Sequence, residues 1–270
     1  MKIPKEAKLN SAKKHRIWVQ GATDQVGHRN YLAALLPHMK ACLDPGFELE
    51  FHTLTPSVTT VHALQEFRVS RAVVRGAIQA EREGYDVFFM NHFQDVGLYD
   101  ARAAVKIPVL GLGEATLHHA CTMGRRLGLI AIHPAFIPTH NEQIGRYGLQ
   151  QRIVGVRAMA ASMSDYMEAF ASPAKKSEIK AVFEREARRL IDDGADVIVP
   201  TGGIPMMLFG MEPDANVGGA PIVNGVTVVI KAAETAVKLK RLGVPVASRH
   251  PQSGFALPSD QTLDQFLQHG

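Results

Sequence analysis

Two stretches of the chain decide the fold: GYDVFFMNH at residues 84–92 and GADVIVPTG at residues 194–202. Each begins with Gly-x-Asp, continues as an apolar run and ends on polar or glycine residues. Each also follows a stretch whose apolar residues have helical spacing. Further matches follow in the same order, residues 107–110 with 220–223 and residues 126–128 with 241–243. This shared order indicates a duplicated βαβ unit.

Strand-like and helix-like segments alternate on both sides of these stretches. Such alternation is typical of parallel sheets covered by helices on both faces. We expect strands near residues 16–20, 48–53, 86–91, 107–110, 127–132, 153–156, 196–200, 221–223 and 244–247. We expect helices near residues 28–43, 59–83, 114–124, 139–148, 164–170, 177–193, 203–210 and 226–242. The sequence therefore predicts an α/β fold of two pseudo-symmetric lobes with parallel sheets and a site in the cleft between them.

The repeat and the charge pattern also suggest how the chain is divided. We expect a flexible basic arm at residues 1–15, a first lobe of residues 16–112 plus 225–270, and a second lobe of residues 113–224. Residues 1–14 hold five lysines and one glutamate, which accounts for the whole net charge of +4. Nucleic-acid binding needs a positive face on the folded surface, so we expect none.

Composition narrows the class of protein further. The 270 residues are 46% hydrophobic and 21% charged, which is typical of a globular protein. No apolar run approaches the roughly 18 residues of a membrane span, and the lysine-rich start lacks the apolar core of a signal peptide. The two cysteines, Cys42 and Cys121, are too few for a disulfide framework or a four-cysteine zinc site. We therefore expect a cytoplasmic protein that does not bind membranes.

The turn after the first predicted strand is polar and carries glycine, GATDQVG at residues 21–27. It matches neither Gly-x-Gly-x-x-Gly nor Gly-x-x-x-x-Gly-Lys, so we expect no nucleotide cofactor. Thr23, Asp24 and Gln25 are candidates for contact with a small polar substrate. A capped turn between strand and helix explains the same residues without a ligand.

The ends of the two repeated runs carry the main candidate site. His92 ends the first run, and a histidine at a strand end can act as an acid or a base near neutral pH. Thr201, Gly202 and Gly203 end the second run. Glycines let the backbone approach a ligand closely, and N–H groups there can hold a carboxylate or a developing oxyanion. A tight turn without a ligand is the alternative for the second run.

The predicted helix after the fourth strand concentrates titratable residues. Glu114, His118 and Cys121 are spaced four and three residues apart, so they share one helix face. We take Glu114 and His118 as candidate catalytic residues, with Cys121 and His140 as further candidates. A third metal ligand at fixed spacing is missing, so we expect no metal. A metal-dependent hydrolase that uses His92, His118 and Glu114 is an alternative.

Several motifs together resemble the Asp/Glu/hydantoin racemase superfamily over roughly residues 16–260. They are DVGL at residues 95–98, IPVLGLGEA at 107–115, FIP at 136–138, RYGL at 146–149, RIV at 152–154, PIVNGV at 221–226 and SR at 248–249. Those from FIP onward are similar to the hydantoin racemase branch. The resemblance implies two pseudo-symmetric lobes with the active site between them, no organic cofactor, and a homo-oligomer.

The resemblance also implies two cysteines, one in each lobe, that act on opposite faces of a carbon next to a carboxylate or carbonyl. Aligned on the strand ends, their positions fall on His92 and Gly202. We therefore expect racemase-like or isomerase-like acid–base chemistry on a small carboxylate or cyclic amide without the pair of thiols. His92 is the expected acid or base, and the expected orienting residues are Asp24, Gln25 and Glu114. The alternatives are a lyase or decarboxylase, a ring-opening hydrolase, and a non-catalytic protein that binds a small acid.

Overall fold

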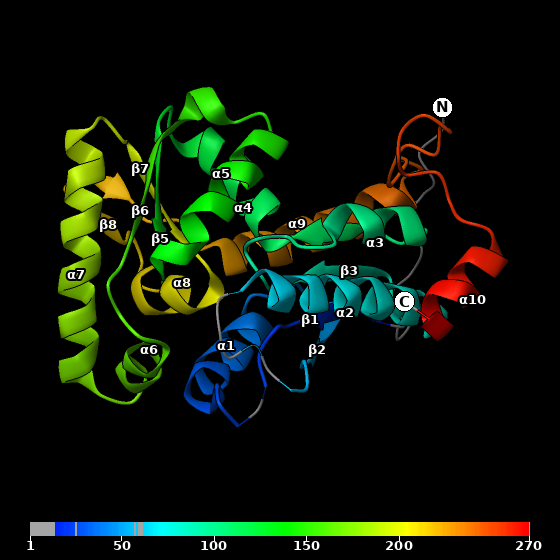
Figure 1. The fold of residues 1–270 in the computed structure, drawn as a ribbon, viewed down its shortest axis with the longest axis horizontal. Coiled ribbons are helices and arrows are strands. Elements are labelled where there is room, and N and C mark those ends of the chain that lie inside the picture. Colours follow the sequence, from blue (N-terminus) through cyan, green and yellow to red (C-terminus); the bar gives the residue numbers. More distant parts are fainter. Residues whose placement is uncertain (1–13, 25, 57, 59–61, 270) are drawn as a thin grey trace.

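The computed structural model describes residues 14–24, 26–56, 58 and 62–269, and two parallel sheets lie side by side in it (Figure 1). The first sheet has the order β2-β1-β3-β4, made of β1 (His15–Gln20), β2 (Phe47–His52), β3 (Val87–Met90) and β4 (Val109–Gly111). The second has the order β6-β5-β7, made of β5 (Leu127–Ala131), β6 (Ile153–Ala158) and β7 (Val197–Thr201). Every strand pair in these two sheets is parallel, which confirms the predicted fold class.

Helices connect the strands and cover both sheets (Figure 1). The longer ones are α1 (Arg29–Ala41), α2 (Ala63–Arg82), α4 (Leu112–Met123), α5 (Ile137–Arg146), α7 (Pro173–Asp192), α9 (Gly225–Arg241) and α10 (Asp260–His269). The shorter ones are α3 (Leu98–Ala104), α6 (Met163–Ala169), α8 (Gly203–Phe209) and the 3₁₀ turns η1 (Pro134–Phe136) and η2 (Gln150–Arg152). A small antiparallel pair, β8 (Asn216–Val217) and β9 (Ala220–Pro221), follows α8 and precedes α9 in the sequence.

The first sheet is buried on both faces because its strands are apolar at successive positions. Ile17 and Val19 of β1 face one apolar cluster, whereas Trp18 between them faces a second cluster under α2 and α3. In β3, Phe89 faces the first cluster and Phe88 faces the second. Side chains alternate across a strand, so near-continuous apolar strands require cover on both sides.

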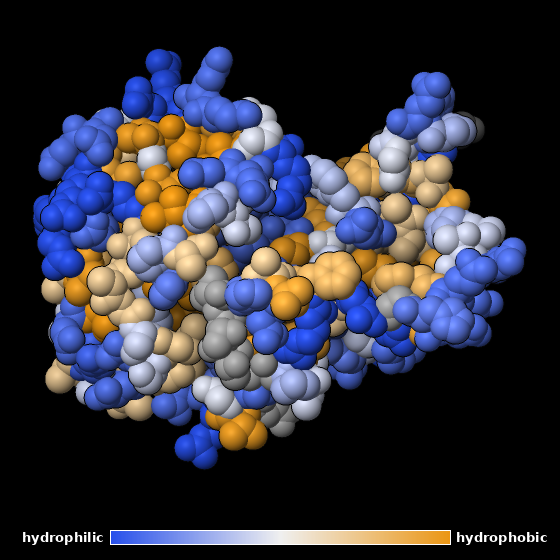
Figure 2. Space-filling view, in the orientation of Figure 1, coloured by the Kyte–Doolittle hydropathy of each residue, from blue (hydrophilic) through white to orange (hydrophobic). Residues whose placement is uncertain are grey.

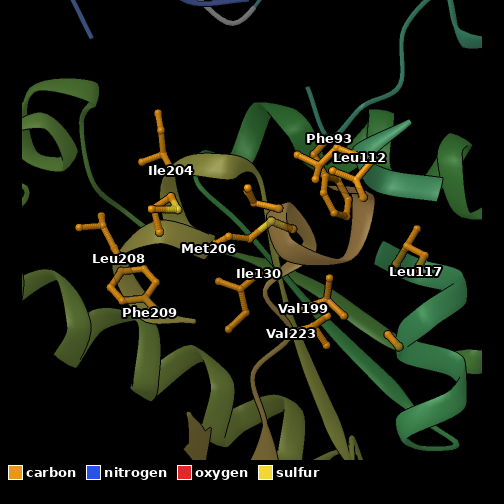
Figure 3. Packing of buried hydrophobic residues seen from close by; sticks show 14 of the residues in the cluster. Phe93, Leu112, Leu117, Ile130, Val199, Ile204, Met206, Leu208, Phe209 and Val223 are labelled. Carbon is orange, nitrogen blue, oxygen red and sulfur yellow. The ribbon is translucent and has the colours of Figure 1, made fainter. Parts of the chain in front are cut away.

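One apolar cluster contains residues of both sheets. It includes Val19 and Phe89 of the first sheet and Ile130 and Val199 of the second. Helices α4 and α9 pack against each other between the sheets, where α4 contacts β4 and β7. Figure 3 shows residues of α8, among them Met206, in the same cluster. The two lobes therefore share an interior.

The surface follows the expected amphipathic pattern. Along α7, buried Phe183 and Leu190 face the second sheet, and hydrophilic side chains cover much of the outer side of this helix (Figure 2). Across the part of the chain with assigned positions, none of the helices combines the length and apolar character needed to cross a membrane.

The structure corrects several boundaries. Residues 244–247, predicted as a strand, form none, because Pro245 cannot donate a backbone hydrogen bond and this segment is largely exposed. The strand expected at 221–223 is reduced to β9 and one isolated bridge at Ile222. Helix α7 begins at Pro173 rather than at residue 177, because Ser172 caps it by accepting from the N–H of Lys175.

Some predictions were incomplete or fall on undescribed positions. Helices α3 and α10 were not predicted. Most of the predicted basic arm, residues 1–13, lies outside the described residues, as does Gln25. The lobe boundaries at residues 112 and 225 stay a prediction.

Candidate active site

A cavity of about 440 Å³ opens at the carboxyl ends of strands from both sheets. The first lobe contributes residues that follow β1 and β3, together with Glu66 at the start of α2. The second lobe contributes residues that follow β5, β6 and β7. The described lining residues are Ala22, Thr23, His28, Tyr31, Val58, Glu66, Asn91, His92, Phe93, Gln94, Ile132, His133, Phe136, Ala161, Ser162, Met163, Tyr166, Thr201, Gly202, Gly203, Ile204 and Pro205. This location is where parallel α/β sheets bind ligands.

His92 lines this cavity directly after β3, where the repeat places it. Its Nε2 atom lies 3.7 Å from Oε1 of Glu66, and the two side chains are 14% and 15% exposed. The Nδ1 atom of His92 is buried and has no hydrogen-bond partner in the described part of the chain. One ring nitrogen thus faces a carboxylate and the other is available to a ligand.

Polar atoms without partners gather in this cavity. Among the described residues, seven buried side-chain oxygen or nitrogen atoms lack a hydrogen-bond partner, and six of them belong to lining residues. They are Thr23 Oγ1, His28 Nδ1, both carboxylate oxygens of Glu66, Asn91 Oδ1 and His92 Nδ1. Each such group costs about 1–3 kcal/mol when left unsatisfied, and nearly all buried polar groups are paired in folded proteins. Their convergence points to a polar ligand.

The Gly202–Gly203 turn faces the first lobe across the cavity. Gly202 has a φ of 150°, which an L-residue rarely adopts. A Cβ atom on Gly203 would collide with the hydroxyl of Tyr31. The same hydroxyl accepts a 3.1 Å hydrogen bond from Nδ2 of Asn91. Both glycines are therefore required by the local geometry, and they leave the backbone open to the cavity.

Behind the cavity wall, Thr201 contacts a buried histidine. The Oγ1 atom of Thr201 lies 2.8 Å from Nε2 of His140, and the side chains of both residues are fully enclosed. His140 Nδ1 lies 3.3 Å from Oε1 of Gln143. Burial lowers the pKa of His140 to about 4, although its hydrogen bond to Gln143 acts to raise it. His140 is therefore neutral at pH 7.

Gln143 joins His140 to a buried carboxyl group. Its Nε2 donates to the carbonyl oxygen of Phe93 and, over 3.2 Å, to Oδ2 of Asp95. Asp95 also accepts from the Tyr147 hydroxyl at 2.6 Å and from the backbone N–H groups at the start of α4. Burial raises the pKa of Asp95 to about 7, and these donors oppose the shift. The network fixes α4 and α5 against the turn that carries His92.

The other predicted catalytic residues, Glu114 and His118, lie apart from His92. Glu114 forms an ion pair with Arg102, and neither residue is a lining residue. His118 is exposed on α4, and its Nδ1 lies 2.8 Å from the carbonyl oxygen of Glu114. None of the three residues predicted to share a face of this helix, Glu114, His118 and Cys121, lines the cavity. The structure therefore supports neither the acid–base role nor the orienting role given to these two side chains.

Neither cysteine lies in the cavity lining. Cys121 is half-buried on α4 and packs against the apolar cluster, outside the cavity lining. Cys42 contacts His38 and Thr227 on α1 and α9, also away from the lining. Over residues 14–24, 26–56, 58 and 62–269, no three His, Cys, Asp or Glu side chains are grouped so that they could bind a metal ion.

In the polar turn after β1, one residue fits contact with a substrate and another caps the turn. Thr23 lines the cavity and its hydroxyl oxygen is without a hydrogen-bond partner. Asp24 instead caps the turn by accepting from the N–H groups of Val26 and Gly27 at 3.1 and 2.6 Å. It also lies 3.8 Å from His28 Nδ1, so it contacts a lining residue without being one.

Sequence reasoning missed eight polar lining residues: His28, Tyr31, Glu66, Asn91, Gln94, His133, Ser162 and Tyr166. His28 and Tyr31 lie at the start of the helix that follows the polar turn, which was a usable signal. Glu66 gave no signal, because it looks like any acidic residue in the first turn of a helix. Tyr166 donates to the carbonyl oxygen of Ile132 across the second lobe.

Comparisons with known proteins agree with this architecture. The family model described as Asp/Glu/Hydantoin racemase matches residues 30–233. A hydantoin racemase of Pseudomonas sp. (strain NS671) is 24% identical over 168 residues, which cover 62% of this chain and 64% of that protein. A hydantoin racemase of Rhizobium meliloti is 26% identical over 156 residues, which cover 58% of this chain and 62% of that protein. The matched regions therefore span less than two thirds of both relatives.

Two solved structures share the fold over nearly the whole chain. The allantoin racemase from Klebsiella pneumoniae superposes with a TM-score of 0.72 at 22% identity, covering 92% of this chain and 95% of that one. The allantoin racemase from Pseudomonas fluorescens gives a TM-score of 0.69 at 20% identity, covering 90% and 97%. These likenesses show the same α/β fold.

Proposed function

Since the chain belongs to the Asp/Glu/hydantoin racemase family, we propose that it is a racemase-like enzyme that moves a proton at a carbon next to a carbonyl group of a small cyclic amide. The observation that carries this proposal is the convergence of unpartnered polar atoms around His92 in the cavity between the lobes. A cavity of about 440 Å³ is in the range of small-molecule sites.

The charges of the lining favour a cyclic amide over a carboxylate. No lysine or arginine is among the described lining residues, so a substrate carboxylate would lack a cationic partner there. The unpartnered oxygens of Glu66 and Asn91 are acceptors, and they suit the N–H groups of a cyclic amide. Burying an ionised group without a partner is strongly unfavourable, which makes the neutral ring the better occupant.

In this proposal His92 is the acid or base that exchanges the proton. General acid–base catalysis by a positioned side chain contributes about 10²–10⁴ to a rate. Glu66 lies 3.7 Å from the His92 ring and holds its orientation. The Gly202–Gly203 turn, which has no side chain to block it, receives the developing enolate oxygen on its backbone. Catalysis by these residues would need no organic cofactor.

Hydrogen–deuterium exchange tests the proposal directly. Each enantiomer of a panel of 5-substituted hydantoins is incubated with the protein in D₂O, and the C5–H signal and the optical rotation are followed. We expect loss of the C5–H signal together with loss of rotation for at least one hydantoin. His92→Ala should slow the inversion by about 10²–10⁴.

Other outcomes identify the alternative functions. If a hydantoin shifts the melting temperature but no hydantoin exchanges or inverts, the protein is a binding protein rather than an enzyme. If the ring opens to a carbamoyl amino acid, it is a hydrolase. If malonate-type acids lose CO₂ while hydantoins stay unchanged, it is a decarboxylase. A homo-oligomeric state and a cytoplasmic location stay predictions.

A further inference from the structure

The hydroxyl of Thr201 combines two features that no other described lining residue shows. Thr201 lines the cavity on the lobe opposite His92, and its hydroxyl lies 2.8 Å from an imidazole nitrogen of His140. His140 itself is not a lining residue, so it can reach a ligand only through Thr201. A hydroxyl next to a base that a third group orients is the arrangement of an activated side chain.

The hydrogen bonds fix where the protons lie. The Nε2 group of Gln143 faces two acceptors, the carbonyl oxygen of Phe93 and the carboxyl group of Asp95, which sets the orientation of the amide. Oε1 of Gln143 is therefore the atom that faces Nδ1 of His140, and Nδ1 must carry the hydrogen. His140 Nε2 is then an acceptor. The Thr201 hydroxyl has two acceptors within reach, His140 Nε2 at 2.8 Å and the carbonyl oxygen of Ile130 at 3.3 Å, and it donates to the nearer one.

We propose that Thr201, with His140 behind it, is the second proton carrier of the site and acts on the face of the substrate carbon opposite His92. This inference rests on the proposed function and names the group that completes it. The sequence placed Thr201 in a cradle for a substrate oxygen; its bond to His140 gives the hydroxyl a proton-transfer role instead.

The proton transfers balance in both directions. Thr201 Oγ takes the proton from the substrate carbon while its own proton moves to His140 Nε2, so no free alkoxide forms. The electron pair of the broken C–H bond enters the enolate. His92, protonated at the start, gives its proton to the opposite face of the carbon. The substrate is inverted, one proton has moved from His92 to His140, and a turnover of the other enantiomer returns it.

The environment of His140 agrees with this role. Burial holds the imidazole neutral at pH 7, so that Nε2 is unprotonated before the reaction and readily returns a proton that it has taken up. A charge on His92 opposes a charge on His140, so that one imidazole at a time carries the proton. The ring of Phe93 packs edge-on against His140 with centroids 5.5 Å apart and keeps the histidine in place.

The test uses the full-length protein and both enantiomers of a hydantoin that the wild type inverts. Thr201→Val removes the hydroxyl with little change in shape, Thr201→Ser restores it, and Thr122→Val is the control at an exposed threonine on α4. In D₂O we expect Thr201→Val to invert either enantiomer at least 100-fold more slowly. It should still exchange C5–H for deuterium, without inversion, in the one enantiomer whose C–H bond faces His92.

The complementary variants complete this pattern. His92→Ala should exchange only the other enantiomer, Thr201→Ser should regain inversion of both, and Thr122→Val should behave as wild type. Inversion by Thr201→Val at the wild-type rate would overturn the inference while the proposed function stands. Loss of exchange for both enantiomers in a folded Thr201→Val would overturn it too, because Thr201 would then hold the substrate. A wild type that neither exchanges nor inverts any hydantoin refutes the proposed function itself.

His140 acts through Thr201 as a positioning residue, and its hydrogen placement can be measured without a substrate. Long-range ¹⁵N–¹H correlation spectra at pH 7 should show His140 in the neutral Nδ1–H form. In Thr201→Val this form should persist, because Gln143 still faces Nδ1. An Nε2–H form in the wild type would overturn the inference, since Nε2 could then accept no proton from Thr201.

Discussion

His140 should make the folded protein sensitive to mild acid. Burial lowers the pKa of this imidazole from 6.5 to about 4, so between these values the unfolded chain binds a proton that the folded chain excludes. The stability that neutral His140 contributes to the folded state is fully present above pH 6.5 and is lost as the pH falls through 4. Each pH unit inside this window removes about 1.4 kcal/mol. From pH 7.5 to pH 4.5 the loss from His140 alone is therefore about 2.5 kcal/mol.

Urea unfolding at these two pH values measures the loss, and a variant isolates it from other titrating groups. His140→Gln cannot titrate, so its free energy of unfolding should fall about 2.5 kcal/mol less than that of the wild type over the same interval. His119→Gln, at an exposed position on α4, is the matched control and should follow the wild type. Equal losses for the wild type and His140→Gln would show that His140 accepts a proton without cost, and the reasoning on its burial would fail.

Three further predictions concern the cavity. His92→Ala should lower turnover about 10²–10⁴-fold in steady-state assays, while its melting temperature stays near that of the wild type because the ring supports little of the core. Glu66→Gln should raise KM about tenfold and also raise the melting temperature, because it removes a buried negative charge that no described residue hydrogen-bonds; unchanged values of both would contradict this. Gly203→Ala should cost about 1–3 kcal/mol in denaturant unfolding, because the added methyl group meets the Tyr31 hydroxyl. Gly145→Ala, where the added carbon has only an ordinary contact, is its control and should not destabilise the protein.

The part of the site predicted from the sequence is the part set by strand ends. The repeated runs place His92 and Gly202 at the ends of β3 and β7, and both line the cavity. This inference works because the carboxyl ends of parallel strands lie on one edge of a sheet. The same logic found Thr201 and Thr23.

The candidates that the cavity lining does not include depended on a helix face. The spacing of Glu114 and His118 correctly shows that they share a face, but spacing does not tell which way that face points. Arg102 lies on α3, a helix that was not predicted, and it forms an ion pair with the Glu114 carboxylate. Glu66 reaches the cavity from the first turn of α2, and only the three-dimensional packing of α2 against the first sheet brings it near His92.

The apolar cluster common to both sheets leaves neither repeat with a complete interior of its own. A fragment cut near residue 112 would present to water the surfaces that α4 and α9 otherwise hide, and it should fail to fold alone. Heat or denaturant should consequently melt the whole molecule in a single cooperative transition. The two lobes therefore depend on each other for their stability.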